Sequence, residues 1–382
     1  VDLAGINVRD LADRNNETVI SGEQGVQGDP SDNRKRLFAI DHDKRRRLKT
    51  LVIDGVTFKG ANEGAFSLNP NSTETLFRYC RFIDNHNLTS TGRGGAIENQ
   101  GDLTVFGSEF VGNHAIKGGA IHSLGGRTTV LSSRFLDNVA EYRPNDAALI
   151  FEASAAGGAI YLDHSRATVQ SSIFHGNQAI GIKAVGGALA VRPDTQGTFA
   201  DTFLTHCTIV GNQIVSGAGR VDVKPLGAGA GLFVDAYDYT QGTTYIDGSV
   251  FWDNEIGGSE QVYPLPERQI DTQGKGYEIL NSIIQGTATD LAANVRSVDP
   301  SFDTASGDEF RLQDFSPLLN EIGDSSPSFS GNAFELLGRP TEVDFRVSHL
   351  PLDSLQQNRQ FGGKRDLGAF ELQSGSASTG LP

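Results

Sequence analysis

The segment GGAIHSLGGRTTVLSSRFLDN, residues 118–138, contains two short words that recur along much of this 382-residue chain. The first word is a glycine pair followed by two apolar residues, and the second is an apolar residue, two variable positions and Asn. The first word is found at residues 94–97, 118–121, 157–160 and 186–189, and as GAGL at 229–232. The second ends at Asn85, Asn113, Asn138, Asn177, Asn212 and Asn254. Such self-similarity is typical of solenoids, in which each repeat forms one coil.

Two weaker copies of the second word flank the clear ones. VTFKGAN, residues 56–62, places its Asn one position late at Asn62, and SIIQG, residues 282–286, has no Asn. The segments between the words, such as 102–110 and 127–135, alternate apolar and polar residues and are rich in β-branched side chains. This pattern predicts strands, and no amphipathic helical segment separates them. The chain is therefore expected to be an all-β parallel β-helix of about eight or more coils, right-handed because parallel crossovers generally are.

The coils predict a domain organisation. We expect an N-terminal cap with degenerate coils over residues 1–50, regular coils over 51–290, further coils and a C-terminal cap over 291–372, and a flexible tail over 373–382. The lengths between the Asn and the next glycine pair differ greatly, from 113–118 in one coil to 138–157 in the next. Insertions are thus expected at one corner, and such a loop-bearing side is often the binding side of a repeat protein.

Inside the coils, equivalent residues should stack on one another. The aromatic or aliphatic residue of the second word points inward, and the residue two positions before it shares its face. Stacked Asn side chains can satisfy one another at a bend, and the glycine pairs suit an unusual φ or a close backbone approach. The inward small residues are Val56, Cys80, Ser108, Ser133, Ser172, Cys207, Ser249 and Ser282. Cys80 and Cys207 then lie too far apart for a disulfide and are expected to be free and buried.

Composition excludes several classes of function. The formal net charge of −15 makes a nucleic acid an improbable partner. No apolar stretch is long enough for a transmembrane helix. The chain contains no Met and begins VDLAGINV. We interpret this as a trimmed start from which a signal peptide is absent, in an extracellular or cell-surface protein.

Residues that could carry chemistry lie on the outward face of the strands after the glycine pairs. The position following the apolar Ile is Glu98, His122 and Tyr161 in successive coils, and Arg93 and Lys117 precede the glycines. If the protein is an enzyme, these five are the catalytic candidates. A cation would neutralise a uronate carboxylate, His122 or Lys117 would remove a proton, and Tyr161 or His122 would protonate the leaving oxygen.

The residues of the same face are also compatible with two other functions. The carboxylates of Glu98 and Asp163 could serve a glycoside hydrolase instead of a lyase. Charged and aromatic residues are also ordinary on an exposed sheet. We therefore expect a non-catalytic ligand-binding face that includes Asp163 and Arg192.

Two long loops are also candidates for ligand contact. EYRPND, residues 141–146, and EQVYPLPERQ, residues 260–269, carry residue types common in binding hot spots. The candidates are Tyr142, Arg143, Tyr263 and Arg268. No metal site or cofactor is expected, although Ca²⁺ stays possible. Asp84, Asp137 and Asp253 alternate with Gly in the second word and fit a turn better than a Ca²⁺ site. His175 and Trp252 are expected to be packing variants.

The repeats resemble those of chlamydial polymorphic outer membrane proteins. DPSF at 299–302, GDEFRLQDFSPLLN at 307–320 and KRDLGAFE at 364–371 are similar to the C-terminal end of bacterial right-handed parallel β-helix surface proteins of the choice-of-anchor Q or CSLREA type. The resemblance covers roughly residues 45–372. It implies an exported right-handed β-helix, usually on a cell surface, and leaves the mode of attachment and the chemistry open.

Three functions follow from these observations. The leading hypothesis is a non-enzymatic surface protein that recognises or adheres to a polysaccharide or a surface protein. The second is an enzyme that acts on polysaccharides, either a uronate polymer lyase or a glycoside hydrolase. The third is a structural stalk or a piece of an envelope layer.

Overall fold

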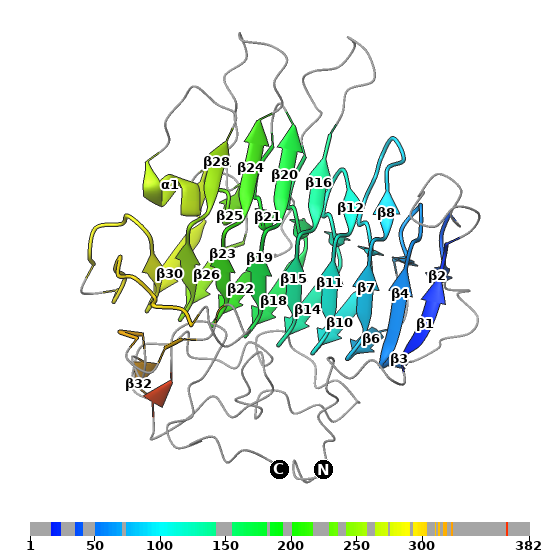
Figure 1. Cartoon of the computed structure of the whole chain (residues 1–382), viewed down its shortest axis with the longest axis horizontal. Helices are drawn as coiled ribbons and strands as arrows, with labels where there is room; N and C mark the ends of the chain where they lie inside the picture. The colour runs from blue at the N-terminus through cyan, green and yellow to red at the C-terminus, as the bar shows by residue number, and fades with distance from the viewer. Residues whose placement is uncertain are drawn as a thin grey trace.

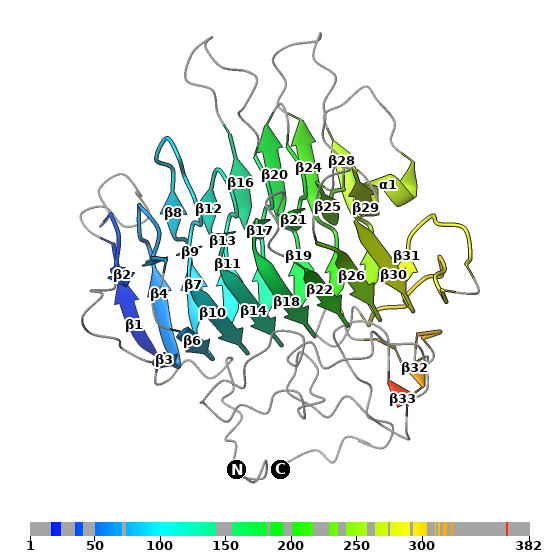
Figure 2. The same cartoon turned by 180° about the vertical axis from the view of Figure 1, so that it is seen from behind.

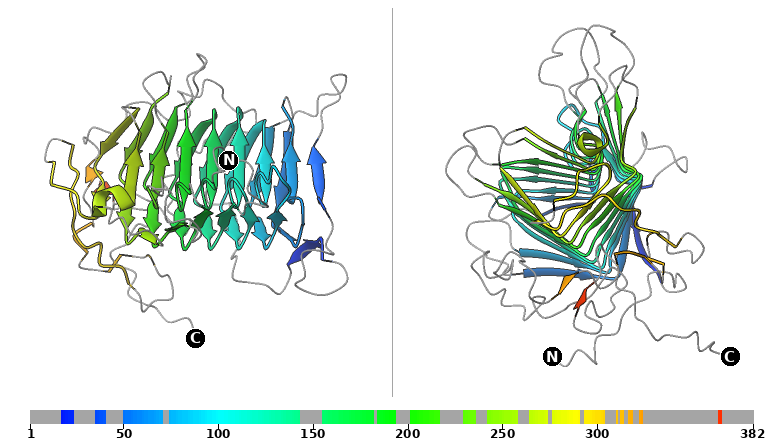
Figure 3. Two further views of the ribbon diagram at one scale, coloured as in Figure 1. Left: turned by 90° about the horizontal axis from the view of Figure 1, so that it is seen from above. Right: turned by 90° about the vertical axis from the view of Figure 1, so that its left-hand side faces the viewer.

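The computed structural model shows a stack of coils whose strands run parallel in four walls (Figures 1 and 2). It describes residues 17–23, 35–40, 50–70, 74–142, 155–181, 184–193, 201–216, 229–235, 242–257, 264–273, 276–290, 293–303, 310, 312–313, 316–318, 322–323 and 364–365. The view along the stack in Figure 3 shows successive coils superposed around one interior. This is the expected parallel β-helix solenoid. Its handedness stays a prediction.

Sheets C and B form two of the four walls. Sheet C consists of β3 (Thr50–Asp54), β6 (Glu74–Arg78), β10 (Asp102–Phe106), β14 (Arg127–Leu131), β18 (Arg166–Gln170), β22 (Thr202–Thr205), β26 (Thr244–Asp247) and β30 (Tyr277–Leu280). Sheet B consists of β2 (Phe38–Ile40), β5 (Phe66–Leu68), β9 (Ile97–Asn99), β13 (Ile121–Leu124), β17 (Ile160–Asp163), β21 (Leu189–Arg192), β25 (Leu232–Val234) and β29 (Ile270–Thr272).

The other two walls are sheet A, formed by the residues of the second word, and sheet D, formed by the strand that follows it. Sheet A consists of β1 (Thr18–Ser21), β4 (Val56–Lys59), β7 (Arg81–Ile83), β11 (Glu109–Val111), β15 (Arg134–Leu136), β19 (Ile173–His175), β23 (Thr208–Val210), β27 (Val250–Trp252) and β31 (Ile283–Ile284). Sheet D consists of β8 (His86–Asn87), β12 (His114–Ala115), β16 (Val139–Glu141), β20 (Gln178–Gly181), β24 (Gln213–Ser216) and β28 (Glu255–Gly257). Outside these walls lie α1 (Leu265–Gln269) and the antiparallel pair β32 (Ile322–Gly323) and β33 (Lys364–Arg365).

The aromatic residues of the second word form one continuous column inside the stack. Phe82, Phe110, Phe135 and Phe174 are paired in register along sheet A and are fully buried. Their ring centroids lie 4.6, 4.7 and 4.8 Å apart, and the rings are within 6° of parallel. The strand spacing of about 4.8 Å thus sets the spacing of the stacked rings. This confirms the prediction that equivalent residues of successive coils stack on one another.

The Asn residues form a second column at the corner between sheets A and D. The Nδ2 of Asn113 donates to Oδ1 of Asn138 in the next coil at 2.9 Å and to the carbonyl oxygen of Phe82 at 2.9 Å. Its backbone N–H donates to the same Asn138 Oδ1. The ladder runs from Asn85 to Asn254 and ends on Gln269. Successive Asn residues of the ladder are between 25 and 42 positions apart in sequence, so each coil accommodates its insertions without a change of register.

At the N-terminal end of this ladder the sequence prediction needs a correction. Asn62 does not take the ladder position, because Ala61 does: its backbone N–H donates to Oδ1 of Asn85 at 3.2 Å. Ala61 follows Phe58 by the same three positions that separate Phe82 from Asn85. The late Asn of the first copy therefore lies one residue outside the ladder.

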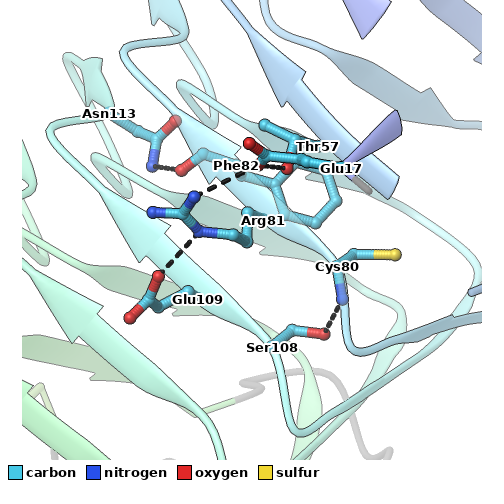
Figure 4. Close-up of polar contacts among 8 residues, drawn as sticks. All are labelled: Glu17, Thr57, Cys80, Arg81, Phe82, Ser108, Glu109 and Asn113. Carbon is cyan, nitrogen blue, oxygen red and sulfur yellow. Dashed lines mark hydrogen bonds and ion pairs between the residues drawn. The ribbon is translucent and has the colours of Figure 1, made fainter. Parts of the chain in front are cut away.

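The inward small residues form a third column at the corner between sheets C and A. The backbone N–H of Cys80 donates to Oγ of Ser108 (Figure 4). The backbone N–H of Ser108 in turn donates to Oγ of Ser133. Each Ser Oγ in turn donates to a carbonyl two positions back, as Ser108 does to Phe106. Cys80 and Cys207 are both buried and free, as predicted. Burial raises the pKa of the Cys80 thiol to about 11, so this thiol stays protonated.

The two glycines of each pair serve different purposes. Gly118 has a φ of +63°, a left-handed conformation that side chains with a Cβ rarely adopt. Gly119 has no such φ, but a Cβ there would lie 2.0 Å from the carbonyl oxygen of Gly158 in the next coil. The unusual φ and the close backbone approach predicted from the sequence are therefore both present, one at each glycine.

The residue before each ladder Asn occupies a turn, as the sequence predicted. Asp84, Asp137 and Asp253 have φ of 50°, 53° and 51°, and the glycines that replace them in other coils, Gly112 and Gly176, have 63° and 66°. Asp tolerates this region better than most residues. The alternation of Asp with Gly therefore reflects a left-handed turn.

Insertions occur at two corners rather than the expected one. Sheet D strands are followed by the long insertions that the sequence indicated, as between β16 and residue 155. A second set lies between sheets B and C, where β21 is followed by β22 only after residues 193–201, whereas β17 and β18 are separated by two residues. Both corners flank sheet B, which places it between the two loop-bearing edges.

The outer face of sheet A is covered near its C-terminal end. Phe310 packs on His175, with ring centroids 4.6 Å apart, and joins a cluster with Val210, Trp252 and Phe302. Leu312 and Leu318 pack on Val250 and Ile283 in a neighbouring cluster. Since His175 and Trp252 both make apolar contacts here, their interpretation as packing variants is confirmed.

Candidate functional site

The outward residues of sheet B form the column that the sequence predicted. Glu98 pairs with His122 and His122 with Tyr161, one on each of β9, β13 and β17. Their strand neighbours, such as Ile121, face the core and are fully buried. Just before the glycine pairs, Arg93 and Lys117 are joined by a parallel bridge one coil apart. The five residues proposed as catalytic candidates therefore lie on three consecutive coils.

His122 lies at the centre of this group and is completely buried, with an exposed fraction of 0 %. Neither ring nitrogen has a hydrogen-bond partner. Burial, together with the charges of Arg93 and Lys117, lowers the pKa of His122 to about 3. The imidazole is consequently neutral at physiological pH, with one unused donor and one unused acceptor.

Tyr161 packs on His122 from the next coil, with ring centroids 5.3 Å apart. The Nζ of Lys117 lies 5.6 Å from the centre of the Tyr161 ring, within the range of a cation–π contact. Tyr161 is 6 % exposed, and its hydroxyl is hydrogen-bonded to the side chain of Arg192. Burial raises the pKa of Tyr161 well above its usual value, and the carboxylate of Asp163 adds to this effect.

The accessibility of this face differs from the sequence expectation. We expected an open sheet surface, but His122 and Tyr161 are buried although they point away from the core. The two rings cover each other, and Lys117 lies over one of them. Arg93 and Lys117 are half-buried and form the more accessible part of the group.

Glu98 is engaged with a residue from an earlier coil. Its Oε2 lies 3.6 Å from Nη2 of Arg36, whose Nε donates to the carbonyl oxygen of Glu63 at 3.0 Å. The side chain of Glu98 is only 16 % exposed. Sequence analysis missed Arg36, since it belongs to the degenerate part of the repeat and is distant from Glu98 in the chain. No motif could have signalled this pair.

A second outward column on sheet B alternates in charge. Asp163 pairs in register with Arg192, and Nε of Arg192 lies 3.8 Å from Oδ2 of Asp235 in the following coil. Oδ1 of Asp163 lies 3.4 Å from Nδ1 of His164. Arg192 is the exposed member, with 48 % of its side chain accessible. Burial raises the pKa of Asp235, and Arg192 opposes this shift.

The loop candidates are only partly described. Tyr142 directly follows β16 and packs in a small apolar cluster with Ala155 and Ala179, so its ring supports the corner between sheets D and B. The carbonyl oxygen of Arg268, in α1, accepts a hydrogen bond from the backbone N–H of Gly231. Arg143 and Tyr263 lie outside the described residues.

A second group of titratable residues lies on sheet D. Nε2 of His114 is 3.2 Å from Oε2 of Glu141, and its ring centroid is 5.8 Å from that of His86. Burial lowers the pKa of His86. Among the described residues, no group of three or more His, Cys, Asp or Glu side chains is placed to hold a metal ion. Nor is any helix in this part of the chain long and apolar enough to cross a membrane.

Comparisons with protein-family models, curated proteins and solved structures found no match to this chain. The resemblance to choice-of-anchor and polymorphic outer membrane repeats therefore stays a prediction. Among the described residues, the strongest candidate for a binding group is the cationic and aromatic cluster of Arg93, Lys117, His122 and Tyr161.

Proposed function

We propose that this protein recognises an anionic partner, with an acidic polysaccharide as the best-matched class, through the outer face of sheet B and without catalysis. The observation that carries the proposal is the pairing of Arg93 and Lys117, one coil apart, beside a buried His122 whose ring nitrogens have no partner. Two stacked cations place positive charge locally in a chain of net charge −15. Such a local field attracts an anionic group.

The chemistry of these residues matches a carboxylate on a sugar. Arg93 has no ion-pair partner among the described residues, and a guanidinium can bind a carboxylate with two parallel hydrogen bonds. The ring of Tyr161 offers an apolar surface beside the charge. Arg192 repeats the cationic character further along the stack and is exposed. A linear polymer that runs along the coils would meet these positions at intervals of about 4.8 Å per coil.

Burial is the reason to favour binding over chemistry. A general base must come within hydrogen-bond reach of the proton that it removes. His122, although neutral and so able to accept a proton, has no exposed surface, and Tyr161 has little. A polymer can reach Arg93 and Lys117 without rearrangement but cannot reach His122. We therefore place uronate elimination second, and hydrolysis by Glu98 and Asp163 third because Glu98 is already paired with Arg36.

An exported or cell-surface location belongs to the same proposal. It is supported by the resemblance of the repeats and of residues 299–371 to bacterial surface β-helices. A protein partner with an acidic surface would use the same cations. The structural stalk is the alternative that needs no ligand at all.

Binding of polygalacturonate to the full chain, measured by titration calorimetry beside a neutral glucan of similar length, tests the proposal. The Arg93→Gln, Lys117→Gln double variant is expected to lose at least tenfold in affinity, about 1.4 kcal/mol. Lys59→Gln serves as the matched control, because Lys59 lies on the outer face of sheet A. It should bind like the parent protein.

Two results would overturn the proposal. One is the absence of binding to polygalacturonate and to other acidic polymers, including alginate and heparin. The other is binding that the double variant leaves unchanged. The same samples are followed by absorbance near 235 nm, where the unsaturated product of elimination absorbs. Product that disappears in His122→Phe would replace the binding proposal with catalysis at this site.

A further inference from the structure

The outer face of sheet B carries a second polar group on the coils that follow Lys117. It consists of Asp163 at the end of β17, Arg192 at the end of β21 and Asp235 directly after β25, and these strands are neighbours in the sheet (Figure 2). We call these three residues the mixed-charge group. Asp163 is in register with Arg192, and Nε of Arg192 lies 3.8 Å from Oδ2 of Asp235. The guanidinium therefore lies between carboxylates of the preceding and the following coil.

The two polar groups on this face differ in charge. Arg93 and Lys117 bring two positive charges together one coil apart. In the mixed-charge group, one positive and two negative charges sum to −1. Burial raises the pKa of Asp235, the charge of Arg192 opposes this shift, and the charge of Asp163 adds to it, so the two carboxylates act on each other. An anionic unit of a ligand is attracted by the first group and repelled by the second.

The exposed part of the mixed-charge group matches neutral hydroxyl groups. The side chain of Arg192 is 48 % exposed and that of Asp235 is 24 % exposed. A hydrogen bond with the Tyr161 hydroxyl holds the guanidinium in place. A guanidinium only donates hydrogen bonds, a carboxylate only accepts them, and a sugar hydroxyl does both. An uncharged sugar unit can therefore bind here without adding a negative charge.

Tyr161 connects the two groups. Nζ of Lys117 lies 5.6 Å from the centre of the Tyr161 ring, and the Tyr161 hydroxyl is hydrogen-bonded to Arg192 on the next coil. Lys117 directly precedes the coil segment of β13, and Arg192 lies on β21, which is two coil spacings or about 10 Å further along the stack. A single carboxylate cannot span this distance. The two groups therefore contact different units of a polymer.

From this difference in charge we infer that the ligand is an acidic polysaccharide in which a uronate unit is followed by a neutral sugar unit. The inference rests on the proposed function, because Arg93 and Lys117 bind the uronate carboxylate. Arg192 donates to the hydroxyl groups of the neutral unit. Asp163 and Asp235 repel any unit that carries a negative charge at that place. These two carboxylates are thus specificity-determining residues.

Two polymers that differ only in the charge of the second unit test the inference. Chondroitin alternates glucuronate with N-acetylgalactosamine, and chondroitin sulfate carries a sulfate on the N-acetylgalactosamine. Binding of each to the full chain is measured by titration calorimetry at pH 8, because His164 lies 3.4 Å from Asp163 and is charged only when it is protonated. We expect chondroitin to bind about tenfold more tightly, although it carries fewer charges. Attraction to Arg93 and Lys117 alone would give the opposite order.

Substitutions identify the residues that cause this preference. In the Asp163→Asn, Asp235→Asn double variant, chondroitin sulfate should bind as tightly as chondroitin or more tightly. The matched control is the Asp102→Asn, Asp137→Asn double variant, which changes the net charge by the same amount. Asp102 lies on sheet C, and Asp137 lies in the turn before Asn138. This control should keep the preference of the parent protein.

The inference is wrong if the parent protein binds chondroitin sulfate as tightly as chondroitin, a comparison that needs no variant to fold. It is also wrong if the folded Asp163→Asn, Asp235→Asn variant keeps the preference for chondroitin. In both cases the proposed function still stands if binding depends on Arg93 and Lys117. If neither polymer binds, the inference is wrong, and the binding of polygalacturonate decides whether the proposed function fails with it.

Discussion

The corner between sheets A and D and the outer face of sheet B differ in whether a buried polar side chain is hydrogen-bonded. At the corner, the amide of Asn113 makes hydrogen bonds to Asn138 and to Phe82, and its neighbours in the ladder do the same. On the outer face, His122 is just as buried and makes none. An unpartnered buried polar group costs about 1–3 kcal/mol, so a stable fold should remove it. The hydrogen bonds at the corner stabilise the stack, whereas those of the outer face leave His122 unused, in keeping with the proposal that this face binds a ligand.

The repeat itself shows the same division. The corner position is Asn in six consecutive coils, because each amide needs an identical amide above and below it. The outward position changes from Glu98 to His122 to Tyr161 and then to Ala190. Since no neighbour requires the same residue there, each coil can carry a different side chain. Functional residues are therefore expected at the outward positions, where the side chain varies from coil to coil.

The largest effect is expected from crowding a glycine of the repeat. In Gly119→Ala the new Cβ would lie 2.0 Å from the carbonyl oxygen of Gly158, a backbone atom held by the stack. We expect a loss of more than about 4 kcal/mol in the free energy of unfolding, enough to impair folding. Gly125→Ala is the control: its φ is +68° but no atom lies within 4 Å of the added Cβ. It should cost about 1 kcal/mol.

Urea unfolding followed by circular dichroism distinguishes the two variants. Equal losses would mean that the close approach between coils at Gly119 costs no more than the left-handed backbone at Gly125, and the assigned reason for the second glycine of the pair would be wrong.

A smaller loss is expected from interrupting the Asn ladder. Asn138→Ala removes the acceptor of the backbone N–H and the Nδ2 of Asn113, at 3.0 and 2.9 Å, and the donor to the carbonyl of Phe110. We expect a loss of about 3 kcal/mol, since several buried groups lose their partners together. Asn62→Ala is the control because Asn62 lies one residue outside the ladder. It should change the unfolding free energy by less than about 0.5 kcal/mol.

Thermal and urea unfolding of both variants make this measurement. If Asn138→Ala unfolds at the same denaturant concentration as the parent protein, water or a shift of the backbone replaces the amide. The corner and the outer face would then not differ in the way described above.

The sequence was sufficient to predict the interior because the interior repeats. Phe135, Ser133 and Asn138 could be assigned to columns, since each has an equivalent in the coils before and after it. The column of Glu98, His122 and Tyr161 could be placed by the same periodicity. Its burial could not, because burial depends on how the His122, Tyr161 and Lys117 side chains pack across coils. The pair of Arg36 with Glu98 was also beyond prediction, since it joins a degenerate coil to a regular one.

The smallest effect at neutral pH is expected on the outer face. His122→Phe replaces an unpartnered polar ring with an apolar one of similar shape, beside the ring of Tyr161. Its unfolding free energy should equal or exceed that of the parent protein by about 1 kcal/mol, since no hydrogen bond is lost. This unfolding free energy is measured without a ligand.

Lowering the pH should widen the difference. His122 has a folded pKa of about 3, below its unfolded value of 6.5, so between these values the unfolded chain binds a proton that the folded chain does not. The parent protein therefore loses up to about 1.4 kcal/mol per pH unit from this group as the pH falls through that window, and the variant does not. Comparing the two proteins removes the contributions of other titrating groups. If the difference in melting temperature between variant and parent stays constant from pH 7 to pH 4, His122 has a partner, and the contrast with the Asn ladder fails.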